Sequence, residues 1–148
     1  LQTDLRRDTS LRLKFVNLRM TQRIYIDTSV VGGIYDDEFD VLTKMFFDKA
    51  FRGEIYLVIS DLLENELINA PKQVRDFFKT LPVNQLEFVN LTKVAIELAE
   101  LYISERVVGE TSRADCRHIA LATLNKADVL VSWNFQHIVN LKRIRGYN

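Results

Sequence analysis

The chain has 148 residues, 47% of them hydrophobic, which suits one domain with a sizeable core. Its 20 Lys and Arg balance 20 Asp and Glu, which excludes a strongly basic coat for nucleic acid but leaves room for a local basic patch. The single cysteine, Cys116, excludes an intrachain disulfide and suits a reducing, cytoplasmic compartment, and no apolar run approaches the roughly 20 residues of a transmembrane helix.

The first 19 residues are expected to lie outside the domain. They are charged and lack capping or turn signals, and Met20 stands just before the first buried strand, where an initiator would stand. We therefore predict a leader or vector-derived segment over residues 1–19 and one domain over residues 20–148. The alternation of apolar residues over 11–16 argues against this division, because it would suit a strand.

Apolar runs separated by helix and turn signals predict alternating strands and helices. Strands are expected at short β-branched or continuous apolar runs, and helices where apolar residues recur every three or four positions. The predicted strands are 24–26, 55–59, 86–89 and 128–132, and the predicted helices are 36–52, 60–70, 72–79, 92–108 and 112–126. This order indicates an α/β domain with a mostly parallel sheet.

Polar residues with oxygen donors stand where strands end or where the next helix begins. Asp27 follows the first strand, and Glu64 lies in the first turn of the helix after the second strand. Asp115 opens the helix that leads into the last strand, and Asn134 follows that strand. Because the carboxyl ends of parallel strands meet at one edge of a sheet, we expect these four side chains to face one pocket.

Carboxylates gathered in one pocket repel one another. Two unit charges about 4 Å apart cost roughly 4 kcal/mol at an effective dielectric near 20, and a bound cation removes this conflict. Oxygen-only ligands favour Mg²⁺ or Mn²⁺ over zinc. Such a metal lowers the pKa of a bound water and neutralises charge on a phosphoryl transition state, so the predicted chemistry is phosphodiester hydrolysis.

Each acid also has a simpler structural interpretation. Asp61 with Glu64, and Ser112 with Asp115, match the spacing of capping boxes. Asp27 could cap a short helix that begins directly after it. The other polar residues that we expect to be turn, packing or surface groups under this interpretation are Asn134, Cys116, His118 and His137.

Four segments in the same order resemble the PIN-domain family, and most of all the VapC-type toxins of toxin–antitoxin pairs. They are Ile-Tyr-Ile-Asp-Thr-Ser at 24–29, Ile-Ser-Asp-Leu-Leu-Glu-Asn-Glu-Leu at 59–67, Ala-Asp-Cys-Arg-His-Ile-Ala-Leu-Ala-Thr at 114–123 and Val-Leu-Val-Ser-Trp-Asn-Phe-Gln-His at 129–137. No single segment is specific, but the four in this order are fairly specific together. The resemblance spans residues 21–148.

The resemblance implies a Rossmann-like, three-layer α/β/α nuclease that cuts single-stranded RNA with Mg²⁺ or Mn²⁺. It also implies a homodimer and a cognate antitoxin that blocks the acidic pocket. The family's fourth acid is replaced here by an asparagine, which puts two-metal catalysis in doubt. The resemblance assigns metal binding to Asp27, Glu64 and Asp115, the fourth position to Asn134, and supporting hydroxyls to Ser29 and Thr28.

The resulting prediction is a metal-dependent endoribonuclease, the toxin component of a type II toxin–antitoxin system. One alternative is a degenerate, non-catalytic domain of the same fold that binds RNA or a partner protein, which Asn134 and the zero net charge favour slightly. A phosphatase with Asp27 as nucleophile fits less well, because Ser29 stands where a second aspartate is needed. The candidates for holding an RNA backbone are Arg113, Arg117, Lys142, Arg143 and Arg145.

Overall fold

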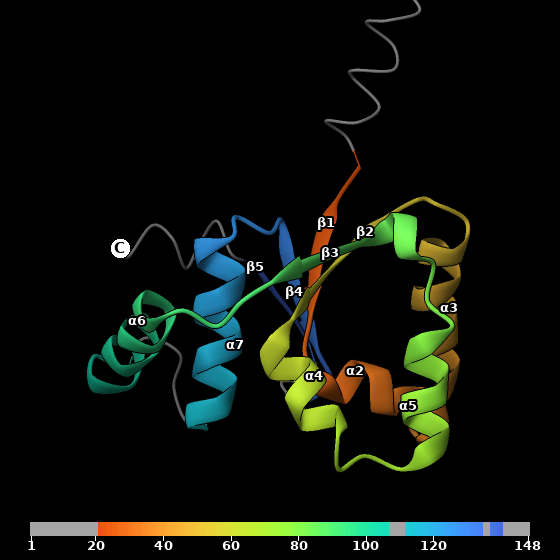
Figure 1. The fold of residues 1–148 in the computed structure, drawn as a ribbon, viewed down its shortest axis with the longest axis horizontal. Helices are drawn as coiled ribbons and strands as arrows, with labels where there is room; N and C mark the ends of the chain where they lie inside the picture. The colour runs from red at the N-terminus through yellow and green to blue at the C-terminus, as the bar shows by residue number, and fades with distance from the viewer. Residues whose placement is uncertain (1–20, 107–111, 135–136, 141–148) are drawn as a thin grey trace, which may run out of the picture.

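The computed structural model describes residues 21–106, 112–134 and 137–140, and in this part of the chain five strands form one sheet (Figure 1). Its strand order is β3-β2-β1-β4-β5. The first four strands run parallel, and β5 pairs antiparallel with β4. The strands are β1 (Arg23–Ile26), β2 (Tyr56–Ser60), β3 (Leu86–Val89), β4 (Val129–Ser132) and β5 (His137–Asn140). The predicted α/β class with a mostly parallel sheet is confirmed.

Helices cover both faces of this sheet, so the domain has the expected three layers (Figure 1). One layer contains α2 (Thr28–Gly32), α3 (Asp40–Phe51), α4 (Asp61–Leu67) and α5 (Lys72–Lys79). The opposite layer contains α6 (Lys93–Ser104) and α7 (Arg113–Leu124). Two short 3₁₀ turns complete the described elements, η1 (Gly33–Tyr35) and η2 (Val83–Gln85).

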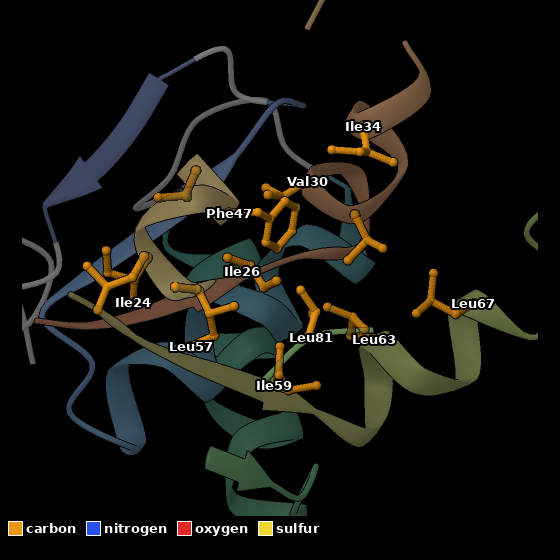
Figure 2. Packing of buried hydrophobic residues seen from close by; sticks show 14 of the residues in the cluster. Ile24, Ile26, Val30, Ile34, Phe47, Leu57, Ile59, Leu63, Leu67 and Leu81 are labelled. Carbon is orange, nitrogen blue, oxygen red and sulfur yellow. The ribbon is translucent and has the colours of Figure 1, made fainter. Parts of the chain in front are cut away.

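The pleat of the strands divides their side chains between two cores. Ile24 and Ile26 of β1 point into the core beneath α2 to α5, which also contains Phe47 of α3 and is drawn in Figure 2. Tyr25, between them, points into the core beneath α6 and α7, which also contains Cys116. Burial on both faces explains why the strands read as continuous apolar runs.

The start of α4 corrects one prediction. Ser60 caps this helix, because its Oγ accepts a hydrogen bond from the backbone N of Leu63 at 3.1 Å. The Asp61 side chain instead binds the segment that follows β3. Its Oδ1 accepts a hydrogen bond from the backbone N of Leu91 at 2.8 Å. The predicted capping box of Asp61 with Glu64 is therefore wrong.

Other boundaries shift by a few residues. The helix predicted from residue 36 begins at Asp40, and the helix predicted to reach residue 108 ends at Ser104. The capping box of Ser112 with Asp115 is confirmed. The strand β5 was not predicted. The segment 1–19 lies outside the described residues, and within them no helix is long and apolar enough to cross a membrane.

Candidate active site at the carboxyl edge of the sheet

Asp27 lies at the carboxyl end of β1 and is only 2% exposed. Its two carboxylate oxygens accept one hydroxyl each: Ser29 Oγ donates to Oδ1 and Ser132 Oγ donates to Oδ2, both at 2.5 Å. Strand register explains the second contact. Ile26 of β1 pairs with Val131 of β4, so the residues that follow them, Asp27 and Ser132, leave the sheet side by side.

A short helix does follow Asp27, but the carboxylate does not cap it. Asp27 occupies the N-cap position of α2 with extended backbone angles, φ −92° and ψ 177°, and its side chain makes no capping hydrogen bond. The capping interpretation therefore fails for this side chain. Its position is set by the two serine hydroxyls, one from α2 and one from the end of β4.

The electrostatic environment of Asp27 disfavours its charge. Burial raises the pKa of this carboxyl above its usual range, while the hydroxyls of Ser132 and Ser29 and the nearby His118 act in the opposite direction. The charge of Asp115 raises the pKa of Asp27 further, so the two carboxylates lie close enough to interact. A buried carboxylate beside a second one is costly unless a proton or a cation neutralises it.

Asp115 reaches this edge from the first turn of α7. Its backbone N donates to Ser112 Oγ at 3.0 Å, and its Oδ2 accepts from the backbone N of Ser112 at 3.4 Å. This is the capping role that the sequence predicts. A carboxylate offers about four lone-pair sites, so the cap leaves Asp115 able to accept further contacts.

A third carboxylate, that of Glu66, is held by a buried histidine. His118 of α7 is 2% exposed, and its Nε2 lies 2.7 Å from Glu66 Oε1. Its Nδ1 lies 2.6 Å from the Tyr25 hydroxyl. The hydrogen bond with His118 lowers the pKa of Glu66, and the charge of His118 lowers the pKa of Asp27. The imidazole thus interacts with both carboxylates.

Glu64, the predicted ligand on α4, lies on another side of the helix. It is exposed, and it lines a pocket of about 240 Å³ between α4 and α5. The other residues that line this pocket are Leu67, Ile68, Arg75, Phe78 and Lys79. The structure therefore brings Glu66, two residues further on, into contact with His118, and it places Glu64 beside α5.

Thr28 and Asn134 complete the surroundings of Asp27. The Thr28 hydroxyl is buried and has no hydrogen-bond partner among the described residues, an arrangement that costs about 1–3 kcal/mol. The lowered pKa of Glu66 comes first from the hydrogen bond with His118, and the Thr28 hydroxyl makes the smallest contribution in the same direction. Asn134 is exposed, and its backbone N donates to Ser132 Oγ at 3.2 Å.

The donors at this edge suit a hard cation that keeps most of its water. Mg²⁺ is commonly held by one or two carboxylates together with water and substrate phosphates. Asp27 and Asp115 supply the carboxylates, and the unsatisfied Thr28 hydroxyl could bond a coordinated water. Among the described residues, no three of His, Cys, Asp and Glu form a ready-made metal cage. The residues therefore fit a largely hydrated ion and do not fit a dehydrated one.

Two of the five basic residues predicted to hold RNA are described. Arg113 is exposed at the start of α7 and forms an ion pair with Glu100 of α6. Arg117 is half-buried, and its Nε has no hydrogen-bond partner within the described ranges. The remaining three lie outside those ranges: Lys142, Arg143 and Arg145.

Sequence reasoning missed two polar residues of this site. Ser132 carried a usable signal, because it ends an apolar run at the same sheet edge as Asp27. For Glu66, the sequence carried no signal that distinguished it from Glu64. His118 was expected to be a structural or surface group, and its burial agrees with the first of these.

Comparisons with solved structures give the class of fold. VapC20 of Mycobacterium tuberculosis, described as a Sarcin-Ricin loop cleaving toxin, matches with a TM-score of 0.54 and 15% identity over 72% of this chain and 86% of that chain. VapBC2 of Rickettsia felis, bound to a DNA fragment from its promoter, matches with a TM-score of 0.56 and 14% identity over 77% and 89%. No protein-family model and no curated protein matches the sequence.

These likenesses define a VapC-type PIN-domain fold. The elements that carry the resemblance in sequence are the ones that frame the site: β1 with α2, the β2–α4 junction, α7, and the end of β4. At 14% and 15% identity the likeness establishes the architecture of the chain. The chemistry of the chain rests on its own residues.

Proposed function

We propose that this chain is a metal-dependent endoribonuclease, the toxin component of a type II toxin–antitoxin system. The observation that carries the proposal is the buried Asp27 carboxylate, held by two serine hydroxyls at the carboxyl edge of a VapC-type sheet. Both neighbouring structures are VapC proteins, and one is described as cleaving the Sarcin-Ricin loop, which supports RNA as the substrate class.

The carboxylates would hold Mg²⁺ or Mn²⁺, with Asp27 and Asp115 as ligands and Glu66 in the role predicted for Glu64. When bound, the cation supplies a water of lowered pKa and neutralises charge on the phosphodiester. Ser29 and Ser132 hold the Asp27 carboxylate in one orientation, so little is lost in ordering it when a ligand arrives.

Asn134 supports a proposal with one metal ion. At the end of β4 it offers an amide oxygen without charge, so it could orient a water but would attract a second cation weakly. Arg117 is our first candidate for contacting an RNA phosphate among the described residues, because it is half-buried on α7 two residues after Asp115 and forms no ion pair there. Arg113 would have to break its ion pair with Glu100 before it contacted a phosphate.

The proposed partners follow from the same role. The Rickettsia felis structure is a VapBC assembly, which supports a cognate antitoxin for this chain. We also propose a homodimer and a cytoplasmic location, as expected for a toxin that acts on RNA. Both are open to direct measurement, the first by light scattering on the purified chain.

RNA cleavage with and without divalent metal tests the proposal. We expect the wild-type chain to cut single-stranded RNA in Mg²⁺ or Mn²⁺ and to stop in EDTA. Asp27→Asn should abolish this activity while the circular dichroism spectrum stays unchanged. Asp48→Asn makes the same change at an exposed position on α3 and should cleave like wild type. Equal cleavage by Asp27→Asn would overturn the assignment.

A non-catalytic module is the second candidate. The absence of a three-ligand cage among the described residues favours it, and so does the uncharged Asn134. A module of this kind would bind RNA or a partner protein without cutting, and Mn²⁺ would not raise its melting temperature. Thermal unfolding with and without Mn²⁺ therefore separates the two candidates.

A further inference from the structure

We propose that His118 is a positioning residue that orients the Glu66 carboxylate toward the site, with Tyr25 and Ser60 fixing the imidazole from behind. The inference rests on the proposed function, in which Glu66 is the third acid. It concerns a side chain that touches neither the proposed cation nor the RNA, and that would act through Glu66.

The histidine is anchored at a fully buried tyrosine. Tyr25 is 0% exposed, and its hydroxyl oxygen lies 3.0 Å from Ser60 Oγ and 2.6 Å from His118 Nδ1. The two rings meet edge to face, with centroids 5.7 Å apart and an interplanar angle of 63°. The imidazole therefore has a fixed plane and a fixed partner at Nδ1.

The direction of the hydrogen bond between His118 and Glu66 follows from which of the two groups can donate a proton. An ionised carboxylate only accepts, so Nε2 must carry the proton that it shares with Glu66. If Tyr25 donates to Ser60, Nδ1 donates to Tyr25 and the ring is an imidazolium. If the ring is neutral, Tyr25 donates to Nδ1 and Ser60 donates to Tyr25. In both arrangements Nε2 donates to Glu66, so the link does not depend on the charge of the ring.

The chain of contacts holds α4 at both ends. Ser60 caps the helix and bonds Tyr25, whereas Glu66, near the end of the helix, bonds His118. This helix has only seven residues, so its rotation is poorly fixed by its own backbone. The two anchors tie it to β1 and α7, the elements that carry Asp27 and Asp115.

The exposure of the two partners points to a role for this contact. The His118 side chain is 3% exposed, whereas that of Glu66 is 37% exposed. A glutamate so exposed would sample several rotamers if nothing held it. His118 thus directs a buried, oriented donor at a carboxylate that is itself exposed to solvent. Buried partners that orient ligands in this way set metal affinity in other proteins.

Two substitutions of His118 separate positioning from packing. Glutamine carries an amide nitrogen at the ε position, so His118→Gln keeps a donor for Glu66. Asparagine ends one atom earlier, so His118→Asn loses that donor although it is equally polar. Glu66→Ala removes the acceptor, whereas glutamine would keep an amide oxygen that still accepts. Glu64→Ala is the matched control two residues away on the same helix.

Mn²⁺ affinity, measured on the full chain by electron paramagnetic resonance, is the first readout. We expect His118→Asn to weaken Mn²⁺ binding by roughly 10- to 100-fold, with His118→Gln within about threefold of wild type. The double variant of His118→Asn with Glu66→Ala should bind no more weakly than Glu66→Ala alone, because His118 acts through Glu66. Wild-type affinity in His118→Asn, or additive losses in the double variant, would overturn the inference.

Nitrogen-15 NMR of the His118 ring at one fixed pH is the second readout. We expect a slowly exchanging Nε2 proton signal that is lost in Glu66→Ala and kept in Glu64→Ala. Its survival in Glu66→Ala would refute the link directly. If the wild type neither binds Mn²⁺ nor cuts RNA yet shows this Glu66-dependent signal, the proposed function fails. The hydrogen bond between His118 and Glu66 then exists but has no role in metal binding. If the wild type binds and cuts while His118→Asn is unchanged, only the present inference fails.

Discussion

Ser132 Oγ donates a 2.5 Å hydrogen bond to Asp27 Oδ2 across the adjoining ends of β4 and β1, between residues 105 positions apart in the chain. Ser132 is 0% exposed and Asp27 is 2% exposed, so water cannot replace the contact. A hydrogen bond to a buried charge is worth more than a neutral one, typically about 1.5–3 kcal/mol. The contact therefore fixes the site and stabilises the domain together.

Ser132→Ala should lower the free energy of unfolding by ~1.5–3 kcal/mol at pH 7, because it leaves a buried carboxylate oxygen with one donor fewer. Urea denaturation followed by circular dichroism measures this. Ser104→Ala is the control, since Ser104 donates only to a backbone carbonyl at the exposed end of α6, and we expect a change of less than about 0.5 kcal/mol. Equal losses of unfolding free energy in the two variants would show that the hydrogen bond to Asp27 stabilises the domain no more than the exposed one of Ser104.

Asp27→Asn should raise the stability of the metal-free chain at neutral pH. Burial places the folded-state pKa of Asp27 above its unfolded value, so the stability that this group contributes is complete below the unfolded pKa and is lost as pH rises through the folded pKa. Asparagine removes that loss. Melting in EDTA should therefore show a higher midpoint for the variant at pH 7, by about 2–4 °C for each kcal/mol gained.

Added Mn²⁺ should reverse that order, because it stabilises only the chain that binds it. At a concentration 100 times the dissociation constant, the gain is about 2.7 kcal/mol. We expect the wild-type melting temperature to rise with Mn²⁺ and that of Asp27→Asn to stay constant. An identical Mn²⁺ response in both chains would place the cation away from Asp27.

Glu66→Gln should reduce metal-dependent RNA cleavage by roughly 10-fold or more, and Glu64→Gln should leave it within about twofold of wild type. The physical reason is that Glu66 is held by His118 of α7, the helix that carries Asp115, whereas Glu64 lines the pocket shared with α5. Initial rates on one labelled RNA, with matched circular dichroism spectra, decide between them. The opposite ranking would restore Glu64 as the third acid.

Gly33→Ala should destabilise the domain by about 1–3 kcal/mol through overpacking. A Cβ atom there would stand 2.5 Å from Trp133 Nε1 and 2.6 Å from Thr43 Oγ1, two atoms that already share a 2.9 Å hydrogen bond. Gly32→Ala meets nothing within 4 Å and lies in α2, so it should be neutral or slightly stabilising. Denaturation midpoints of the adjacent pair measure the difference. Equal midpoints would mean that the Trp133 side chain moves aside freely.

Trp133 shows how one residue joins several elements around the site. Its backbone N donates to Ser29 Oγ at 2.9 Å, and that hydroxyl in turn donates to Asp27. Its ring stacks on Phe39 with an interplanar angle of 2°. The sequence pattern does not indicate this cluster, because its members come from α2, the turn after β4 and the turn before α3. Only the folded chain brings them together.

The sequence alone determined the layers of this protein and the place of Asp27. Short apolar runs and three- or four-residue periodicity suffice for strands and helices, because each depends on local burial and backbone preference. The position of Asp27 at the end of a buried strand follows from the same pattern. The β4–β1 register, which places Ser132 against Asp27, depends on strand pairing and appears only in the fold.

Which of Glu64 and Glu66 contacts His118 depends on tertiary structure. At 100° per residue, these two glutamates flank the buried stripe of Leu63 and Leu67 on opposite sides, each about 80° from its centre. Helical periodicity therefore cannot distinguish them. The direction in which α4 presents its two flanks depends on the packing of Leu63 and Leu67 and on the contact with His118, a residue of a helix 52 positions further along the chain.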